Sequence, residues 1–290
     1  MEKNKNRRQL NTKVLGTAAV LAASLCFSTG GLLMKIIPWS PLAINGIRNL
    51  IASVVIGLYI ILIHHKIRFN RTVVIGAICL TGVTTLYSVA NKLTTAGNTI
   101  VLQYTAPIWI VIFMYLFLGK RPDKISLISI LIVFTGILCF FYEGISTGRW
   151  LGDLCALLSG AFYAGVFMLN SFKNGDSLSS VFFSQIACGV ILSPLVLRET
   201  VFTMPVLAAV FVLGVVQVGL AYVFFTTGIK YVDPVTASII NALEPILNPI
   251  LVAVFYGEVL GRMSLFSAAI VLCGILYYNI RRGLSHQKGA

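Results

Sequence analysis

The sequence contains few charged residues and very few acids. Only 11% of its 290 residues are charged, and Asp and Glu together number 9, whereas soluble domains carry about 25% charged residues. Hydrophobic residues make up 58% of the chain, and the mean hydropathy is +0.92. A water-soluble fold of this composition would expose large apolar patches, so an ordinary soluble domain is excluded.

The motifs that carry enzyme and metal chemistry are also missing. The six cysteines stand singly within apolar stretches, without CxxC or Cys/His spacing, so the sequence predicts no disulfide framework, no metal site and no cofactor. No P-loop, Gly-rich dinucleotide motif or nucleophile elbow with its partners is present, and the three histidines lie in a loop and in the tail. The sequence therefore does not predict an enzyme.

Basic residues are in excess, and the formal net charge is +13. They form no stripe with interleaved aromatics, which argues against nucleic-acid binding. They lie between apolar runs instead, where membrane lipids with acidic headgroups are the expected partner.

Long apolar segments are what the sequence has in abundance. A helix needs roughly 20 apolar residues to cross the hydrocarbon core. Charges, prolines and glycines divide the chain into ten such segments, near 14–34, 42–63, 73–90, 97–118, 125–142, 151–170, 178–197, 205–227, 234–256 and 263–280. The first segment follows a basic tail but lacks a clear cleavage site, so we interpret it as a retained helix. The predicted fold class is an all-α membrane protein with ten transmembrane helices.

Lys and Arg are distributed unequally between alternate loops. With ten spans, 16 of the 22 Lys and Arg residues fall on the side of the two termini, five fall on the opposite side, and Arg48 lies within the second span. Because cytoplasmic loops carry the excess of Lys and Arg, both termini are predicted to be cytoplasmic. An odd number of spans would scramble this bias.

The two halves of the chain resemble each other. Residues 94–136 align with 232–274 at a constant shift of 138, which pairs Pro107 with Pro245, Gly119 with Gly257, and Gly136 with Gly274. Nearer the front, a shift of 135 pairs Ser24, Phe27 and Lys35 with Ser159, Phe162 and Asn170. Each half has five spans, so the second half enters the membrane from the opposite side. The predicted organisation is a basic tail at 1–13, inverted five-helix repeats at 14–142 and 151–280, and a second tail at 281–290.

Two related motifs lie in spans 4 and 9. The first is Asn98-Thr-Ile-Val-Leu-Gln-Tyr-Thr-Ala-Pro107, followed by Leu118-Gly-Lys-Arg-Pro122. The second is Asn241-Ala-Leu-Glu-Pro-Ile-Leu-Asn-Pro249, followed by Tyr256-Gly-Glu258. These motifs resemble those of EamA-type permeases of the drug/metabolite transporter superfamily, and Arg48 lies where many members carry an arginine. Lys120 departs from the pattern, since the family often has Glu after this glycine.

The resemblance implies a specific architecture and location. It implies ten helices, a central cavity lined by spans 1–4 and 6–9, and peripheral spans 5 and 10. It also implies a bacterial cytoplasmic (inner) membrane protein that exports amino acids, other metabolites or drugs. No charge enters the middle of spans 5 and 10, so we expect them to face lipid or a second copy of the chain in a homodimer.

One acidic residue, Glu244, lies well inside a predicted span. Asn241 and Asn248 are placed at helical spacing on either side of it, so the three share one face. Pro245 and Pro249 remove backbone donors, which leaves carbonyl groups in need of other partners or of a wet cavity. The ninth span therefore directs a carboxylate and two amides toward something other than lipid.

Glu244 has two interpretations. Removal from water favours the protonated form of a carboxyl group, which suits binding of a cationic group and proton coupling. Alternatively, Glu244 pairs with Arg48 and locks two helices together. Arg48 is in turn either a site residue or a helix anchor.

Other polar and aromatic residues complete the candidate site. Tyr87 and Asn91 share a face of span 3, Gln103 is the repeat mate of Asn241, and Trp109 lies near Gln103. Aromatic rings can stack on a substrate cation. The candidate substrate-binding set is Glu244, Asn241, Asn248, Gln103, Tyr87, Asn91, Tyr163, Trp109 and Arg48.

The sequence predicts a secondary-active transporter of small metabolites, such as amino acids or other zwitterionic or cationic solutes, or of drugs. We expect export by alternating access between the two halves, with proton exchange at Glu244. The alternative is a non-transporting membrane scaffold or assembly subunit, whose polar faces are satisfied inside a closed bundle.

Overall fold

The computed structural model describes residues 2–119, 121–170, 174–229, 231–232, 240–241, 243–258 and 260–288, with side chains except at 2–13, 118, 167, 169–170 and 282–288. Helices are the only regular elements in this part of the chain. Eight helical segments are long and apolar enough to cross a membrane, and two shorter apolar helices, Trp150–Val166 and Glu244–Tyr256, bring the number to the ten predicted. The predicted all-α membrane fold is confirmed.

Several spans consist of more than one helical segment. In chain order the segments are α1 (Glu2–Ser28) and α2 (Gly30–Ile36) in span 1, α3 (Pro41–Leu62), α4 (Arg71–Leu93), α5 (Ala96–Gln103) and α6 (Ala106–Leu118) in span 4, α7 (Lys124–Ser146), α8 (Trp150–Asn170), α9 (Ser177–Leu192) with the 3₁₀-helix η1 (Ser193–Arg198), α10 (Met204–Val212) with the π-helix η2 (Leu213–Leu220) and α11 (Ala221–Gly228) in span 8, α13 (Glu244–Tyr256) and α14 (Arg262–Lys288). Helices α1 and α14 extend past the predicted apolar segments, because the tails are rich in helix-forming Lys, Arg and Gln.

Polar residues in the turns fix where helices begin. Ser40, Asn70, Thr95 and Asp123 precede α3, α4, α5 and α7, and each accepts a hydrogen bond from the backbone amide three residues later. Asp176 does the same for α9. These bonds satisfy amides that the first turn of a helix leaves without a partner.

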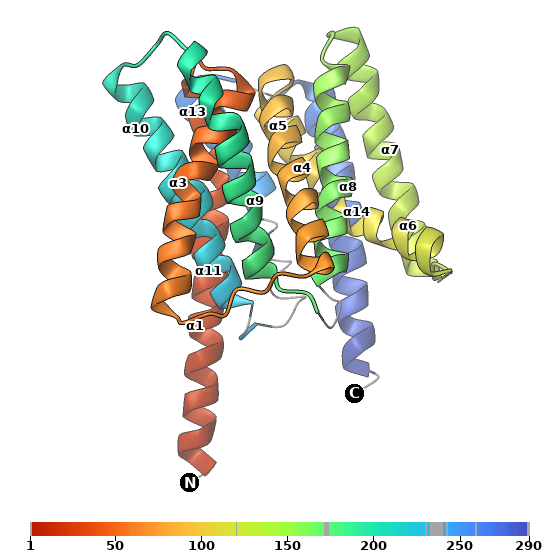
Figure 1. Cartoon of the computed structure of the whole chain (residues 1–290). Coiled ribbons are helices and arrows are strands. Elements are labelled where there is room, and N and C mark those ends of the chain that lie inside the picture. The colour runs from red at the N-terminus through yellow and green to blue at the C-terminus, as the bar shows by residue number, and fades with distance from the viewer. Residues whose placement is uncertain are drawn as a thin grey trace.

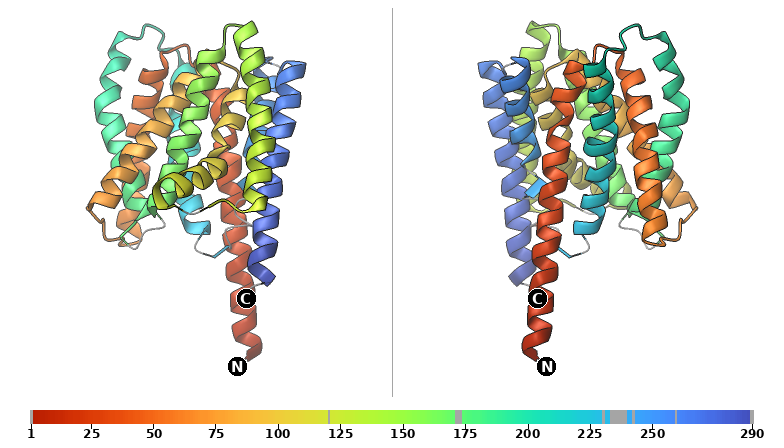
Figure 2. Two further views of the ribbon diagram at one scale, coloured as in Figure 1. Left: turned by 90° about the vertical axis from the view of Figure 1, so that its right-hand side faces the viewer. Right: turned by 90° about the vertical axis from the view of Figure 1, so that its left-hand side faces the viewer.

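Both ends of the chain lie on one side of the helical bundle. Helix α1 begins and α14 ends at the lower end in Figure 1, and the two further views agree. We call this end the terminal face, and the opposite end, where α2 leads into α3 and α4 leads into α5, the far face. Helix α6 runs strongly tilted across the bundle near the terminal face, as Figure 2 shows.

The inverted repeat is visible in the helix boundaries. Helices α6 and α13 have 13 residues each, and they begin at Ala106 and Glu244, which are mates under the shift of 138. Each ends at a left-handed glycine, Gly119 with a φ of 62° and Gly257 with a φ of 76°. Helices α7 and α14 begin at positions related by the same shift, and α4 and α11 end 135 residues apart. The predicted duplication is therefore present in the structure.

Four spans depart from regular α-helix near their middle. Span 4 breaks between α5 and α6, span 9 has a turn at Leu243 directly before α13, and span 1 breaks at Thr29. Pro107 and Pro245 lie in the first turn after two of these breaks, where a missing amide hydrogen is tolerated. Span 8 contains the π-helix η2. Such irregular turns free backbone groups and often mark functional sites.

Helices α7 and α14 form a closely packed pair at one edge of the bundle. A Cβ added at Gly136 of α7 would lie 2.6 Å from Val271 Cγ2, and one added at Gly274 of α14 would lie 2.7 Å from Val133 Cγ2. The two glycines and the two valines are mates under the shift of 138. Small residues allow this backbone approach, as is common between membrane helices.

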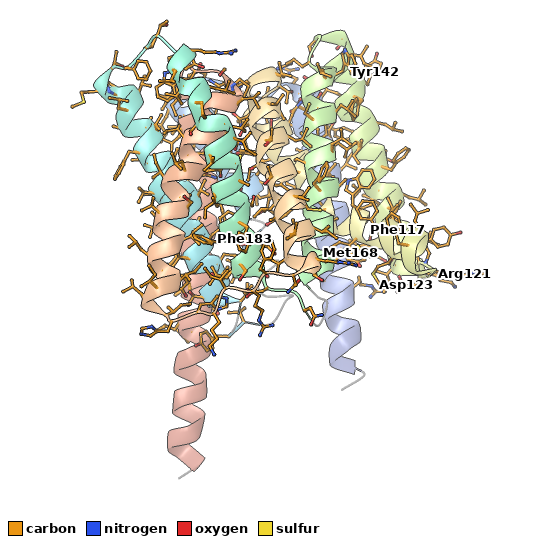
Figure 3. The ribbon with its side chains drawn as sticks, in the orientation of Figure 1. Phe117, Arg121, Asp123, Tyr142, Met168 and Phe183 are labelled. Carbon is orange, nitrogen blue, oxygen red and sulfur yellow. The ribbon has the colours of Figure 1, made fainter. Side chains whose placement is uncertain are left out.

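The outer surface of the bundle is strongly apolar. Large side chains such as Phe117, which is 75% exposed, and Tyr142, which is 73% exposed, project away from it (Figure 3). In water this surface would be unfavourable, whereas lipid chains match it.

Candidate functional site

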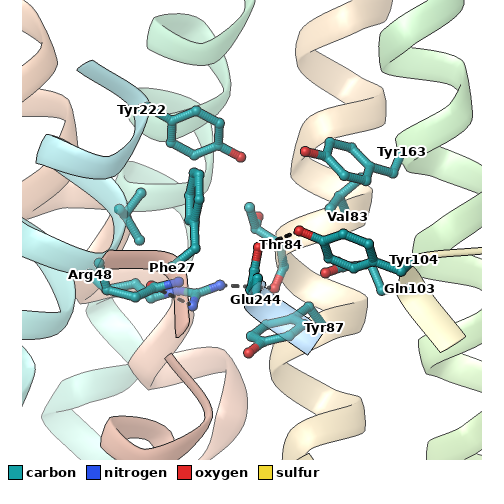
Figure 4. Close-up of a pocket in the computed structure, with 12 residues that line it drawn as sticks. Phe27, Arg48, Val83, Thr84, Tyr87, Gln103, Tyr104, Tyr163, Tyr222 and Glu244 are labelled. Carbon is teal, nitrogen blue, oxygen red and sulfur yellow. Dashed lines mark hydrogen bonds between the residues drawn. The ribbon is translucent and has the colours of Figure 1, made fainter. Parts of the chain in front are cut away.

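A small cavity of about 60 Å³ lies at the centre of the bundle, beside the breaks in spans 4 and 9. Its walls come from both halves of the chain (Figure 4). The lining residues are Phe27, Arg48, Val83, Thr84, Tyr87, Gln103, Tyr104, Tyr163, Gln217, Val218, Tyr222 and Glu244. The site is therefore polar and aromatic, although the surrounding bundle is apolar.

Glu244, the first residue of α13, is held by a tyrosine of the other half. Tyr104 Oη lies 2.7 Å from Glu244 Oε2 and 2.9 Å from the carbonyl oxygen of Asn241. That carbonyl would bond to the amide of residue 245 in a regular helix, but Pro245 has no amide hydrogen. Tyr104 thus offers a donor that the helix cannot, and this carbonyl shares its single proton with the Glu244 carboxyl group.

Asn241 connects the same group to span 1. Ser24 Oγ, on α1, donates to Asn241 Oδ1 at 2.9 Å. A continuous set of hydrogen bonds therefore runs from span 4 through the broken part of span 9 to span 1.

Arg48 is buried in α3, and neutral acceptors hold its guanidinium. These are Asn45 Oδ1 at 3.0 Å, Ser88 Oγ at 3.1 Å and the Thr84 carbonyl at 3.2 Å from Nη2, and Gln217 Oε1 at 3.5 Å from Nη1. The guanidinium also lies 5.8 Å from the centre of the Tyr87 ring. Within the described part of the chain, no ion pair joins Arg48 to Glu244. Arg48 and Glu244 therefore line the same cavity without forming an ion pair with each other.

Aromatic rings form much of the cavity wall. Phe27 and Tyr222 pack edge to face, with ring centres 5.3 Å apart. Tyr87, Tyr104 and Tyr163 complete the wall from α4, the end of α5 and α8 (Figure 4). Such a wall is suited to an organic cation or to an apolar group carrying a charge.

Toward the far face, the cavity gives way to a buried polar layer. Asn91 and Asn248 are fully buried, and no protein hydrogen bond of good geometry satisfies their side-chain amides, although the Tyr87 hydroxyl interacts with both. Gly31 of α2 packs directly against the Asn248 side chain. Buried amides of this kind are satisfied by ordered water or by a ligand.

Comparison with known proteins identifies the architecture. The sequence profile of the EamA-like transporter family matches residues 14–142 and 150–280. The chain belongs to the EamA-like transporter family. Uncharacterized transporter YwfM of Bacillus subtilis (strain 168) is 26% identical over 271 residues, which cover 89% of this chain and 91% of the relative. A solved crystal structure with 18% sequence identity matches 94% of this chain and 98% of its own with a TM-score of 0.63, which shows a shared fold.

In this EamA-like transporter, five of the nine predicted site residues line the cavity: Glu244, Arg48, Tyr87, Gln103 and Tyr163. Asn241 joins them through Tyr104, and Asn91 and Asn248 form the buried layer beside the cavity. Trp109 lies outside the cavity lining on α6, where its ring centre is 5.9 Å from that of Phe113.

Some lining residues of the EamA-like transporter were not in the predicted set. Thr84 and Gln217 are polar residues inside apolar spans, which is the criterion that selected the predicted set. Gln217 lies in the π-helix η2. Phe27 and Tyr222 resemble many other aromatic residues of the apolar spans, so their sequence gives little signal. Tyr104 follows Gln103 directly, and its direction toward Glu244 depends on the break between α5 and α6.

Proposed function

We propose that this EamA-like transporter is a secondary-active carrier of a small zwitterionic or cationic metabolite, or of a drug with such a charge. We propose further that it works as an exporter by alternating access and exchanges its substrate for a proton at Glu244. One observation carries the proposal. Among the described residues that line the cavity, Glu244 is the only acid, and it lies at a helix break, held by a side chain from the other half.

The charges of the cavity suit a zwitterion. A substrate ammonium group matches the Glu244 carboxylate and the surrounding rings. A substrate carboxylate matches Arg48, whose Nη1 has only distant acceptors, Gln217 Oε1 at 3.5 Å and Met34 Sδ at 3.8 Å. Because Arg48 and Glu244 do not pair, they can bind opposite ends of one molecule that replaces some of their hydrogen bonds to neutral groups. A substrate with only the cationic group uses Glu244 alone.

Tyr104 allows Glu244 to exist in either protonation state. A phenol has a single proton, but Tyr104 Oη has two acceptors within 2.9 Å. When Glu244 is ionised, that proton goes to the carboxylate. When Glu244 is protonated, its own O–H can donate to Tyr104 Oη, and the phenol proton is free for the Asn241 carbonyl. Both states retain hydrogen bonds, which supports exchange of a proton for a cationic substrate.

The size of the cavity supports a conformational cycle. Pockets for small organic ligands typically occupy about 300–1,000 Å³. At about 60 Å³ this cavity holds a few water molecules and no such ligand. Loading therefore needs the walls to separate, and the walls belong to different halves of an inverted repeat.

A direct test begins with binding. Purified protein is screened by thermal shift against the free L-amino acids and against tetraphenylphosphonium, since ligand binding stabilises the folded state. The strongest binder is then the flux probe in reconstituted vesicles with an imposed pH gradient. We expect proton-driven flux in the wild type and a loss of at least about a hundredfold in Glu244→Gln, because the variant cannot exchange a proton.

The matched control is Glu143→Gln, which removes a glutamate outside the cavity, where its Oε2 accepts from Ser264 Oγ. Wild-type flux with unchanged pH dependence in Glu244→Gln would contradict the proton-exchange proposal. Absence of binding and flux for every probe would favour the alternative, a membrane scaffold.

The homodimer predicted through spans 5 and 10 remains a prediction. The outer faces of α7 and α14 carry exposed apolar side chains such as Leu131 and Phe266. Lipid and a second copy of the chain would satisfy this surface equally well.

A further inference from the structure

At the far face, an ion pair from two other spans holds the turn between α4 and α5. Lys35 Nζ lies 2.7 Å from Glu258 Oε2 and also donates to the Thr94 carbonyl at 3.0 Å. The other carboxylate oxygen, Glu258 Oε1, accepts from the backbone amide of Ala96 at 2.8 Å. Both oxygens of Glu258 are therefore engaged, one by an ammonium group and one by the first amide of α5.

A second carboxylate holds the same turn from α8. Thr94 Oγ1 donates to Asp153 Oδ1 at 2.7 Å, and Asn98 Nδ2 donates to the same oxygen at 3.1 Å. Lys35 and the turn belong to the first half of the chain, whereas Glu258 and Asp153 belong to the second. These bonds consequently join the two halves at the far face.

The ion pair lies on the helices that lead away from the cavity. On α13, Asn248 lies one turn beyond Glu244, and it contacts Gly31, which lies one turn before Lys35 on α2. Helix α5 begins at the ion pair and ends at the cavity. Side chains of the pair are only 12% and 21% exposed, so water screens their attraction less than it screens a surface pair. The joint of α2, α5 and α13 therefore separates the cavity from the far face.

The inverted repeat provides no equivalent pair at the terminal face. The repeat mate of Lys35 is Asn170, and the repeat mate of Glu258 is Lys120. The structure does not describe these two side chains, but their chemistry follows from the sequence. An amide and an ammonium group cannot form an ion pair.

We infer that the Lys35–Glu258 pair is a latch that closes the far face and has no Lys–Glu counterpart at its repeat mates. Among the described residues, His65 and Asp176 also join the two halves near the terminal face, but that imidazole is charged only when protonated. The inference rests on the proposed transport function, and it adds which face of the empty transporter is closed. Because the latch stabilises the conformation that is shut at the far face, the empty transporter loads from the terminal face. With the termini predicted to be cytoplasmic, this bias favours export.

The latch is tested by thiol accessibility, which needs no substrate. Ser28→Cys places a nearly isosteric reporter at a buried position beside the break in span 1. A membrane-impermeant maleimide is added on the far side of vesicles whose orientation is fixed by protease access to the C-terminal tail. Protein without the introduced cysteine gives the background from the six native thiols. Labelling should be slow in the otherwise unchanged protein.

Breaking the latch should open this route. Lys35→Met and Glu258→Gln should each raise far-side labelling about fivefold or more, the factor expected from about 1 kcal/mol of lost closing energy. Lys35→Arg keeps a cation that can donate to both Glu258 and the Thr94 carbonyl, so it should label nearly as slowly as the parent, which a folding defect at this position would not do. Lys92→Met removes a neighbouring ammonium group that donates to the Ile37 carbonyl, and it should leave labelling unchanged.

The opposite results would overturn the latch. Labelling of Lys35→Met and Glu258→Gln as slow as that of the parent would show that the pair does not close the far face. So would labelling of Lys35→Arg as fast as that of Lys35→Met, or an equal increase in Lys92→Met. These outcomes are separate from the flux test of Glu244. Loss of proton exchange in that test leaves the latch result standing, and failure of the latch leaves the carrier standing.

Discussion

Span 4 and span 9 have nearly the same shape but different chemistry. After its break, each continues as a helix of 13 residues that ends at a left-handed glycine. Yet the mate of Glu244 is Ala106, and the mate of Tyr104 is Ala242. Each half therefore supplies one member of the central Tyr104–Glu244 pair and an alanine in place of the other. The duplication gives both spans the same backbone geometry, and differences between mate residues give only one of them the carboxylate of the cavity.

The largest effect is expected from placing an acid at the symmetric position. Ala106 is 2% exposed, so Ala106→Glu would bury a carboxylate without a partner phenol from the other half. We expect a loss of about 3 kcal/mol in the free energy of unfolding, measured by denaturant titration in detergent. Ala106→Gln, of similar volume but uncharged, should lose clearly less. Equal stability of the two variants would mean that the symmetric position is as wet as the site of Glu244.

The next effect tests the part of the repeat that remained symmetric. Gly136→Leu and Gly274→Leu each push a side chain into the opposite helix of the α7–α14 pair, where a Cβ alone already comes within 2.7 Å of a valine methyl. Each should lower the free energy of unfolding by about 2 kcal/mol, as overpacking does. Thr135 is the exposed neighbour of Gly136, so Thr135→Leu is the control and should leave the free energy of unfolding nearly unchanged. Strongly unequal costs at the two glycines would show that this pair has also diverged.

Removal of the Tyr104 hydroxyl should have a smaller effect that is confined to transport. Tyr104→Phe keeps the ring but removes the donor to Glu244 and to the Asn241 carbonyl. One lost hydrogen bond to a charged group corresponds to about 1.5 kcal/mol, so we expect exchange to slow about tenfold. The flux assay of Glu244→Gln measures it, with Tyr222→Phe, from the same cavity wall, as the matched control. Equal slowing in both variants would mean that the rings, rather than the Tyr104–Glu244 bond, control the rate.

The smallest effect concerns the cap of α9 near the terminal face. Burial alone would raise the pKa of the Asp176 carboxyl, but hydrogen bonds from Ser179 and His65 outweigh burial and lower this pKa below its ordinary value. His65 Nε2 lies 2.9 Å from Asp176 Oδ2. A carboxyl with a lowered pKa stabilises the fold above its unfolded pKa of about 3.9, and it loses that contribution as the pH falls.

Asp176→Ala should therefore cost about 1 kcal/mol from pH 7 down to about 4, and the difference from wild type should shrink as the pH falls below about 4. Thermal unfolding over this pH range measures it. Asn70→Ala removes a cap that does not titrate, on α4, so its cost should stay constant with pH. A constant cost for Asp176→Ala as well would show that the charge of Asp176 does not contribute.

Sequence patterns predicted the frame of the molecule better than its centre. The ten spans and the 138-residue shift follow from apolar length, prolines and glycines, because lipid imposes helices of fixed length. Glu244, Arg48, Tyr87, Gln103 and Tyr163 were found because a polar group inside an apolar span is costly. Trp109 shares a span with Gln103, but it lies on α6, beyond the break, and outside the cavity lining. A helical wheel assumes continuous turns, so it does not place residues on the far side of a break.

By itself, the sequence determined that the chain crosses the membrane ten times, that its halves are inverted, and which span carries the central acid. These properties are local, since they depend on length, polarity and repeats along the chain. Only the tertiary structure decided that Tyr104 rather than Arg48 holds Glu244, and that Glu258 pairs with Lys35. Those partners are distant in sequence, and their meeting depends on helix breaks and tilts that packing of the whole bundle fixes.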